Sequence, residues 1–240
     1  MHTTLDSIRD IKLYQPKHGY RFSVDALLLY SFINLKHIKR IADLGAGSGI
    51  IGLLLAKKYP SSEVTLIEIQ KSLFELSQKN IILNKLENRV KAIRADLRRS
   101  VTHLLTKGTA SYDLAVSNPP FRCPLTGKLS HEEEKSVARH EIKLKLPELL
   151  MSVSLLLKAK GRFSLIYLPE RLIELIEEMR KAHLEPKRLR FVHSKASSPA
   201  KMLLMEAVKD GRAGLSIERP MFIYGDDGTY SEEMRGIYGI

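Results

Sequence analysis

Short apolar runs of strand type alternate with helical segments along most of the chain. The first such unit, "RIADLGAGSGIIGLLLA" at 40–56, joins an apolar run to an apolar helix through closely spaced glycines. Strands that alternate with helices of 10–15 residues form right-handed βαβ units, and such units place their strands in a parallel sheet. The alternation therefore predicts an α/β fold with a mainly parallel sheet.

Seven strands are expected from the apolar runs, over 39–45, 63–69, 89–97, 112–120, 161–168, 187–194 and 200–209. Helices are expected over 48–59, 71–85, 145–160 and 170–183, besides one that begins near Asp25. Only about six residues separate the last two strands, which is too few for a crossover helix. We therefore expect this last pair to form an antiparallel hairpin.

The ends of the chain carry shorter signals. Gln15-Pro16 and Gly19 predict a turn before the first helix. Beyond Gly211 we expect a strand, a turn at Gly225–Gly228 and a short terminal helix. No second domain is expected, so the sequence predicts one domain over 1–240, with a core over 36–210 between a leading segment (1–35) and an extension (211–240).

The charge of the chain limits the classes of partner. Lys and Arg number 39 against 27 for Asp and Glu, a formal net charge of +12. Such an excess favours a polyanionic partner, because Lys and Arg neutralise phosphates in nucleic-acid binding. A basic surface without a partner remains the alternative at this point. The sequence does not give the oligomeric state.

The remaining composition excludes other classes. A single cysteine, Cys123, permits no disulfide framework within the chain and is typical of a cytoplasmic protein. No Cys and His residues have zinc-site spacing, so no metal is expected. The longest apolar runs are far shorter than a membrane span, and "MHTTLDSIRD" lacks the apolar run of a signal peptide. We expect no membrane partner, and we interpret Cys123 as having no role in the chemistry.

The glycine-rich turn after the first strand contains Asp43, Gly45, Gly47 and Gly49. Glycines let a ligand approach the backbone, and the following helix N-terminus favours a carboxylate or a phosphate. The third glycine comes one position earlier than in the dinucleotide fingerprint. Asp43 would repel a pyrophosphate but tolerates an ammonium or a sulfonium. The loop therefore fits a ligand with an amino acid tail better than NAD, and a tight turn without a ligand remains the alternative.

Two further carboxylates end the next two expected strands. Glu68 is placed to accept both hydroxyls of a ribose, and Asp96 is placed to accept the amine of an adenine. The alternatives are a solvated strand end for Glu68 and a helix cap for Asp96. Because the carboxyl ends of parallel strands meet at one edge of a sheet, where open α/β sheets bind ligands, these carboxylates and the glycine turn indicate one site.

In this order and spacing, "DLGAGSGIIGLLLA", "TLIEIQ", "IRADLRR" and "DLAVSNPPF" resemble the motifs of class I S-adenosylmethionine-dependent methyltransferases. The resemblance implies a doubly wound, seven-stranded, mostly parallel sheet with an antiparallel terminal hairpin, and it implies S-adenosylmethionine as cofactor. It also implies that residues 1–35 lie over the cofactor, where Ser23 or Asp25 touches its methionine part, with a helix cap as the alternative for both. The expected cofactor-binding residues are Ser23, Asp25, Asp43, Gly45, Gly47, Glu68, Asp96, Leu97 and Asn118.

Three further segments, "YQPKHGYRFSVDALLLYSF", "ARHE" and "SPAKMLLMEAVK", resemble the tRNA adenine-N6 methyltransferases that act on adenine 37 of a valine tRNA. This resemblance implies tRNA as the nucleic-acid partner. It also implies that Arg139 and His140, within "ARHE", contact RNA or brace a neighbouring loop. A solvated charged helix start is the alternative for this cluster.

The stretch Asn118-Pro119-Pro120-Phe121 carries the expected chemistry. An exocyclic amine of a base is a poor nucleophile, and two fixed acceptors, the Asn118 side-chain oxygen and the Pro119 carbonyl, would orient its lone pair. The prolines stiffen the loop, and Phe121 offers a face for a flipped-out base. The same clamp suits guanine N2 of ribosomal RNA, adenine of DNA or a protein glutamine amide. A non-catalytic RNA-binding module is the alternative of another class.

Basic residues gather around the expected terminal hairpin. Each taken singly reads as a surface charge, but together with the net charge they predict an RNA-binding surface. The residues are Lys187, Arg188, Arg190, Lys195 and Lys201, and Arg98 and Arg99 add two further cations after Asp96.

Overall fold

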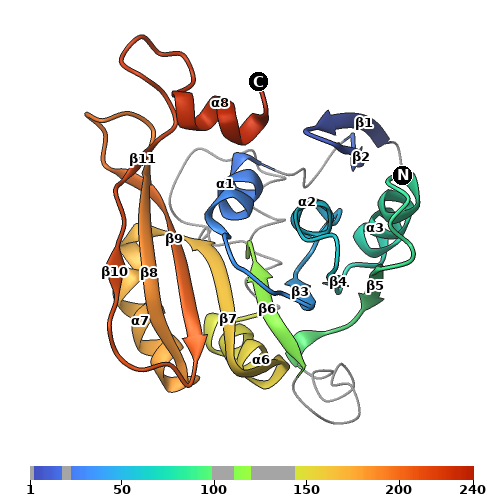
Figure 1. The fold of residues 1–240 in the computed structure, drawn as a ribbon, viewed down its shortest axis with the longest axis horizontal. Helices are drawn as coiled ribbons and strands as arrows, with labels where there is room; N and C mark the ends of the chain where they lie inside the picture. Colours follow the sequence, from blue (N-terminus) through green and yellow to red (C-terminus); the bar gives the residue numbers. More distant parts are fainter. Residues whose placement is uncertain (1–2, 18–22, 99–110, 120–143) are drawn as a thin grey trace.

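The structure is a computed structural model that describes residues 3–17, 23–98, 111–119 and 144–240. Within these residues the main sheet has nine strands, in the order β10-β8-β9-β7-β6-β3-β4-β5 with β11 beside β8 (Figure 1). The seven longer strands are β3 (Arg40–Leu44), β4 (Glu63–Glu68), β5 (Val90–Arg94), β6 (Tyr112–Ser117), β7 (Leu157–Tyr167), β8 (Leu184–His193) and β9 (Ala200–Lys209).

The strand directions confirm the predicted α/β class. Strands β3 to β7 are parallel to one another, whereas β9 runs antiparallel between β7 and β8. The expected antiparallel hairpin of the last two long strands is therefore confirmed. Beyond Gly211, where one strand was expected, two short strands, β10 (Ser216–Ile217) and β11 (Met221–Phe222), pair in parallel with β8. They cover an edge that would otherwise offer unpaired backbone groups.

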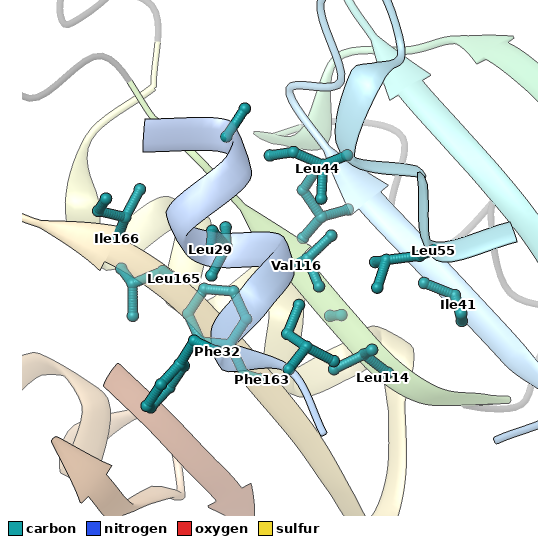
Figure 2. Close-up of a cluster of buried hydrophobic side chains, with 14 of the residues drawn as sticks. Leu29, Phe32, Ile41, Leu44, Leu55, Leu114, Val116, Phe163, Leu165 and Ile166 are labelled. Atoms are coloured by element: carbon teal, nitrogen blue, oxygen red, sulfur yellow. The ribbon is translucent and has the colours of Figure 1, made fainter. Parts of the chain in front are cut away.

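Helices cover both faces of the sheet (Figure 1). One face carries α1 (Val24–Phe32), α2 (Ile50–Lys58) and α3 (Lys71–Leu83), and the other carries α6 (Leu146–Leu156) and α7 (Leu172–Lys181). Figure 2 shows Leu29 and Phe32 of α1 over Val116 of β6 and Phe163 and Leu165 of β7. All five side chains are buried, so the removal of apolar surface from water holds α1 to the centre of the sheet. Within the described residues, none of the helices has the length and apolar character needed to span a membrane.

Helix α6 is shorter than predicted. The helix expected over 145–160 ends at Leu156, and β7 begins with the next residue. The Lys209 ammonium on β9 donates to the carbonyls of Ser154 and Leu157, at 2.5 and 2.9 Å. These carbonyls belong to the last turn of the helix and its cap, so a side chain from a distant strand satisfies them and the chain continues as a strand.

The N-terminal segment forms a hairpin that the sequence did not predict, and Gln15 and Pro16, expected in a turn, lie instead at the end of its second strand, while Gly19 lies outside the described residues. Strands β1 (Thr3–Ile8) and β2 (Ile11–Pro16) pair antiparallel, and Arg9 in the connecting turn has a φ of 50°. The Arg9 guanidinium donates to the carbonyls of Gly236 and Ile237, at 2.9 and 2.7 Å. Both carbonyls lie in α8 (Glu232–Tyr238), the expected terminal helix. The hairpin is thus joined to the C-terminal segment, while the division of the chain at 35 and 210 stays a prediction.

Candidate active site

Four neighbouring parallel strands end at one edge of the sheet, and the predicted site residues lie at these ends. Asp43 lies in β3, Glu68 is the last residue of β4, Asp96 follows β5 by two residues, and Asn118 directly follows β6. The hydroxyl of Ser117, at the end of β6, donates to the carbonyl of Leu44 at 2.8 Å. The sequence therefore predicted the location of the edge correctly.

The glycine-rich turn adopts a backbone that favours glycine. Gly45, Gly47 and Gly49 have φ values of 72°, 57° and 92°. A Cβ at Gly49 would lie 2.9 Å from Leu66 Cδ1, so a larger residue fits neither the conformation nor the space. The backbone N–H of Gly45 donates to the carbonyl of Ile67 at 2.9 Å, which fastens the loop to β4. Helix α2 then begins at Ile50 and directs its N-terminus to this loop.

Glu68 braces the glycine loop. Its side chain is buried, and its carboxylate accepts from the N–H of Gly47 at 2.9 Å and from the N–H of Gln70 at 2.8 Å. The alternative of a solvated strand end is therefore wrong. One bond goes to each carboxylate oxygen, and each oxygen can accept one more hydrogen bond. Contact with a ribose stays a prediction that this geometry allows.

Asp43 is buried with an incomplete set of partners. Its side chain is 1% exposed; Oδ2 accepts from the N–H of Gly52 at 2.9 Å, while Oδ1 has no hydrogen-bond partner among the described residues. Burial raises the pKa of Asp43 to about 7; the bond from Gly52 acts against this rise, and the charge of Glu68 adds to it. An unpaired buried carboxylate oxygen costs free energy, which a cationic ligand group would recover.

Asp96 is engaged by the backbone and side chain of a nearby arginine. Its Oδ1 accepts from the N–H and the Nε of Arg98, both at 3.0 Å, and its Oδ2 accepts from Nη2 at 2.6 Å. This arrangement supports the local capping alternative for Asp96, and contact with an adenine amine stays a prediction. Leu97 is buried in the core, and its carbonyl accepts from the hydroxyl of Ser152 at 3.0 Å.

The start of α1 brings two further predicted residues into place. Ser23 is the exposed cap residue of α1, and in the described structure its side chain makes no capping hydrogen bond. Asp25 lies in the first turn of the helix. The cap alternative is thus not realised by the Ser23 hydroxyl, and the contact of either residue with a cofactor stays a prediction.

The predicted acceptor pair is only partly described. Asn118 and Pro119 follow β6 and are both partly exposed at the edge that carries Asp43 and Glu68. The other expected residues of this region lie outside the described residues: Arg99, Pro120, Phe121, Cys123, Arg139 and His140. The clamp around a substrate amine therefore stays a prediction.

Two of the predicted RNA-binding arginines are bonded within the protein. The Arg188 guanidinium lies over the Phe32 ring at 4.4 Å and donates to Glu218 at 2.7 Å and Glu206 at 3.2 Å. Arg190 makes a bidentate pair with Glu233, at 2.6 and 2.8 Å. Each guanidinium already binds a carboxylate, an anionic partner like a phosphate. This weakens the prediction that these two arginines bind RNA.

The three predicted RNA-binding lysines differ from the arginines. Lys187 donates to the carbonyl of Arg212 at 3.2 Å. Lys195 is partly exposed and Lys201 is exposed, on either side of the turn between β8 and β9. Their contact with RNA stays a prediction.

Sequence reasoning missed two residues that support the site. Gly52 lies inside α2, where a Cβ would lie 2.2 Å from Leu66 Cδ2, and its N–H reaches Asp43. A glycine within an otherwise apolar helix was the available signal. Asn80 on α3 bonds to the carbonyl of Ser48 in the glycine loop at 2.9 Å. A buried amide on a helix carries no comparable sequence signal.

Comparison with known proteins is consistent with this architecture. The family model described as the methyltransferase small domain matches residues 22–137. A relative from Porphyromonas gingivalis, named tRNA1(Val) (adenine(37)-N6)-methyltransferase, is 30% identical over 79% of this chain and 80% of its own length. Relatives of the same name from Parabacteroides distasonis and Shewanella woodyi are 29% and 27% identical, over 94% and 90% of this chain and 92% and 89% of their own lengths.

Solved structures share the fold. A predicted O-methyltransferase from Agrobacterium tumefaciens superposes with a TM-score of 0.71 at 21% identity, over 90% of this chain and 95% of that chain. The structure of M. jannaschii TYW2 in complex with AdoMet gives a TM-score of 0.57 at 18% identity, over 86% of this chain and 84% of that chain. The sheet order, the glycine loop and these relatives agree: the chain is an S-adenosylmethionine-dependent N-methyltransferase and belongs to the tRNA1(Val) (adenine(37)-N6)-methyltransferase family.

Proposed function

We propose that this enzyme methylates the N6 amine of an adenine in tRNA, and that the target is position 37 of a valine tRNA. The observation that carries the proposal is the placement of Asn118-Pro119 directly after β6, at the strand edge that also holds Asp43 and Glu68. The names of the relatives that match across most of the chain support the choice of adenine and of tRNA. The excess of Lys and Arg, 39 against 27 acidic residues, supports a nucleic-acid substrate.

The cofactor-binding residues supply complementary groups. Bound S-adenosylmethionine contributes a methyl group activated on a positively charged sulfur. The unpaired Oδ1 of Asp43 fits the cationic part of such a ligand, and the spare acceptor sites of Glu68 fit its ribose hydroxyls. Of the two, Asp43 is the better supported, because its buried oxygen lacks a partner among the described residues.

The acceptor pair activates the amine. The Asn118 side-chain oxygen accepts one N–H of the amine and the Pro119 carbonyl accepts the other, so the nitrogen lone pair is freed from the ring and directed at the methyl carbon. The amine held in this way would accept the methyl group that bound S-adenosylmethionine supplies, with the cofactor sulfur as the leaving group. The resulting ammonium then releases its proton to water, so no protein base is required. Phe121 stacks on the extruded base, which contributes ~1–3 kcal/mol in comparable sites.

We place this reaction in the cytoplasm. A single cysteine is consistent with a reducing compartment, in which a thiol stays free.

The test is methyl transfer from labelled cofactor to tRNA, ribosomal RNA, DNA and protein, followed by nucleoside analysis. We expect N6-methyladenosine in valine tRNA and none in a transcript with guanosine at position 37. Replacement of Asn118 by Ala should lower kcat about 10²–10³-fold, because a fixed polar group of the reaction centre is lost, and the variant should still bind the cofactor.

Asn34→Ala is the matched control, since Asn34 is exposed on a loop between α1 and β3. It should leave kcat unchanged. Label that appears only in guanosine or in protein would overturn the adenine assignment, and an Asn118→Ala variant of full activity would overturn the clamp.

A further inference from the structure

Two buried asparagines, Asn80 on α3 and Asn84 at the C-cap position directly after this helix, bond to the backbone of the N-terminal hairpin. Asn84 accepts from the N–H of Lys12 at 2.9 Å and donates to the carbonyl of Lys12 at 2.7 Å. One helical turn earlier, Asn80 accepts from the N–H of Tyr14 at 2.7 Å and donates to the carbonyl of Tyr14 at 3.0 Å. Lys12 and Tyr14 are alternate residues of β2, so the two amides bond to the strand edge in the same way.

Asn80 makes one contact for which Asn84 has no counterpart. Its side-chain NH₂ group also donates to the carbonyl of Ser48, at 2.9 Å. Ser48 is buried between Gly47 and Gly49 in the glycine loop. The second bond from the Asn84 NH₂ group goes instead to the carbonyl of Asn80, in the last turn of α3, at 2.7 Å. Asn80 therefore joins α3, β2 and the glycine loop.

The conformation of that loop depends on the hydrogen bond to the Ser48 carbonyl. The glycines on either side of Ser48 have positive φ values, so the intervening peptides rotate more easily than those of other residues. A buried carbonyl that loses its donor is destabilised, and the loop would then adopt conformations in which the Ser48 carbonyl finds another partner. Asn80, 0% exposed, holds the peptide between Ser48 and Gly49 in a single orientation.

We propose that Asn80 is a positioning residue for S-adenosylmethionine: it fixes the Ser48–Gly49 peptide, and so keeps the glycine loop in the conformation that receives the cofactor. Through Tyr14 it also makes the shape of the loop depend on the docked hairpin. The inference rests on the proposed role of the glycine loop as the cofactor site.

Asn84 provides the matched control. Asn80→Asp and Asn84→Asp each keep the acceptor for a β2 N–H and lose the donor, but Asn80→Asp alone removes the bond to Ser48. Both variants should unfold at a lower temperature. Asn80→Asp should raise the dissociation constant of S-adenosylmethionine about tenfold, as for one buried hydrogen bond lost, whereas Asn84→Asp should leave it unchanged. In turnover, Asn80→Asp should raise KM for the cofactor without changing kcat or KM for RNA.

A measurement on the unmodified protein covers the case in which Asn80→Asp does not fold. Titration with S-adenosylmethionine should shift the side-chain NH₂ signals of Asn80 in ¹⁵N–¹H NMR spectra, and those of Asn84 should stay in place. Equal cofactor affinities of the two variants would overturn the proposal. So would an unmoved Asn80 signal when the amides of Gly45 and Gly47 shift, although the proposed cofactor site would then stand. Unmoved Gly45 and Gly47 signals at saturating cofactor would overturn the site as well.

Discussion

Two carboxylates are buried in different halves of the same sheet, and the structure surrounds them differently. Glu206 of β9 is 0% exposed and forms ion pairs with Arg162 and Arg188. Asp43 of β3 is 1% exposed, yet it accepts only the peptide N–H of Gly52, and its Oδ1 has no hydrogen-bond partner within the described residues. One half of the sheet therefore neutralises its acid internally and the other does not.

The presence or absence of a buried counter-ion distinguishes a carboxylate that stabilises the fold from one that is suited to bind a ligand. Burying an ion is costly unless a partner of opposite charge is buried with it. Glu206 has its partners in the folded chain, so nothing outside the protein is needed. Asp43 has its pKa raised to about 7, chiefly by burial, and a cationic ligand group would stabilise its anionic form. A missing counter-ion is thus informative about function, whereas a complete ion pair is informative about packing.

The largest expected effect comes from removing the neutralised acid. Glu206→Gln should lower the free energy of unfolding by about 3 kcal/mol, because it leaves two arginines in a partly buried cluster without their shared partner. Cofactor affinity of the folded protein should not change. Urea denaturation and calorimetric titration measure the two quantities.

Glu218→Gln is the control for that variant, because Glu218 meets the same Arg188 at a more exposed position. Glu218→Gln should lower the free energy of unfolding by less than about 1 kcal/mol. If both variants lower the free energy of unfolding equally, burial does not strengthen the ion pairs of Glu206. The contrast drawn with Asp43 would then be wrong.

A smaller effect, of opposite sign, is expected for the acid without a counter-ion. Asp43→Asn should raise the free energy of unfolding by about 2 kcal/mol at pH 8, since a pKa shift from 3.8 to about 7 is a penalty of about 4 kcal/mol, partly offset by an unpaired amide. The same variant should bind S-adenosylmethionine at least about tenfold more weakly, because a charge-assisted contact is lost.

The pH dependence follows from the direction of this shift. The folded pKa of Asp43 lies above the unfolded value, so the folded state binds the proton more tightly. The contribution of Asp43 to stability is therefore intact below pH 3.8 and is lost as the pH rises to about 7. The free energy of unfolding, measured by denaturation at several pH values from 4 to 8, should fall more steeply with pH for the natural protein than for Asp43→Asn. Equal pH dependence in the two proteins would contradict the raised pKa of Asp43.

The smallest expected effect concerns cations that differ in their partners. Lys201→Ala should weaken tRNA binding about fivefold at physiological salt and lower the slope of log K against log salt by about one, as for one lost phosphate contact. Arg190→Ala should leave that slope nearly unchanged, because Arg190 already pairs with Glu233. Filter-binding series in NaCl measure both, and equal slopes for the two variants would remove the distinction.

Local signals explain what could be predicted from the sequence. The glycine turn and the apolar strands depend on residues that are close together in the sequence. The sequence therefore predicted that Asp43, Glu68 and Asn118 lie at one edge of the sheet. The end of α6 was not, because it depends on Lys209, which lies far along the chain. The partners that decide such a boundary exist only once the sheet has assembled.

Charged residues show the same limit. The sequence suggests that Arg188 contacts a phosphate, but Glu206 of β9 and Glu218, directly after β10, bond to it in the structure. Asp96 has the appearance of a ligand group, yet Arg98 occupies both of its oxygens. A sequence gives the charge of a residue, while the identity of its partner comes from tertiary structure.

The bonds from Arg9 to Gly236 and Ile237 have a consequence for how the protein is made. The hairpin that carries Arg9 leaves the ribosome early, and its partner carbonyls in α8 are synthesised more than two hundred residues later. The hairpin therefore cannot complete its contacts during most of synthesis. Contacts between such distant residues form slowly, which makes the joining of these two segments a late step in maturation of the nascent chain.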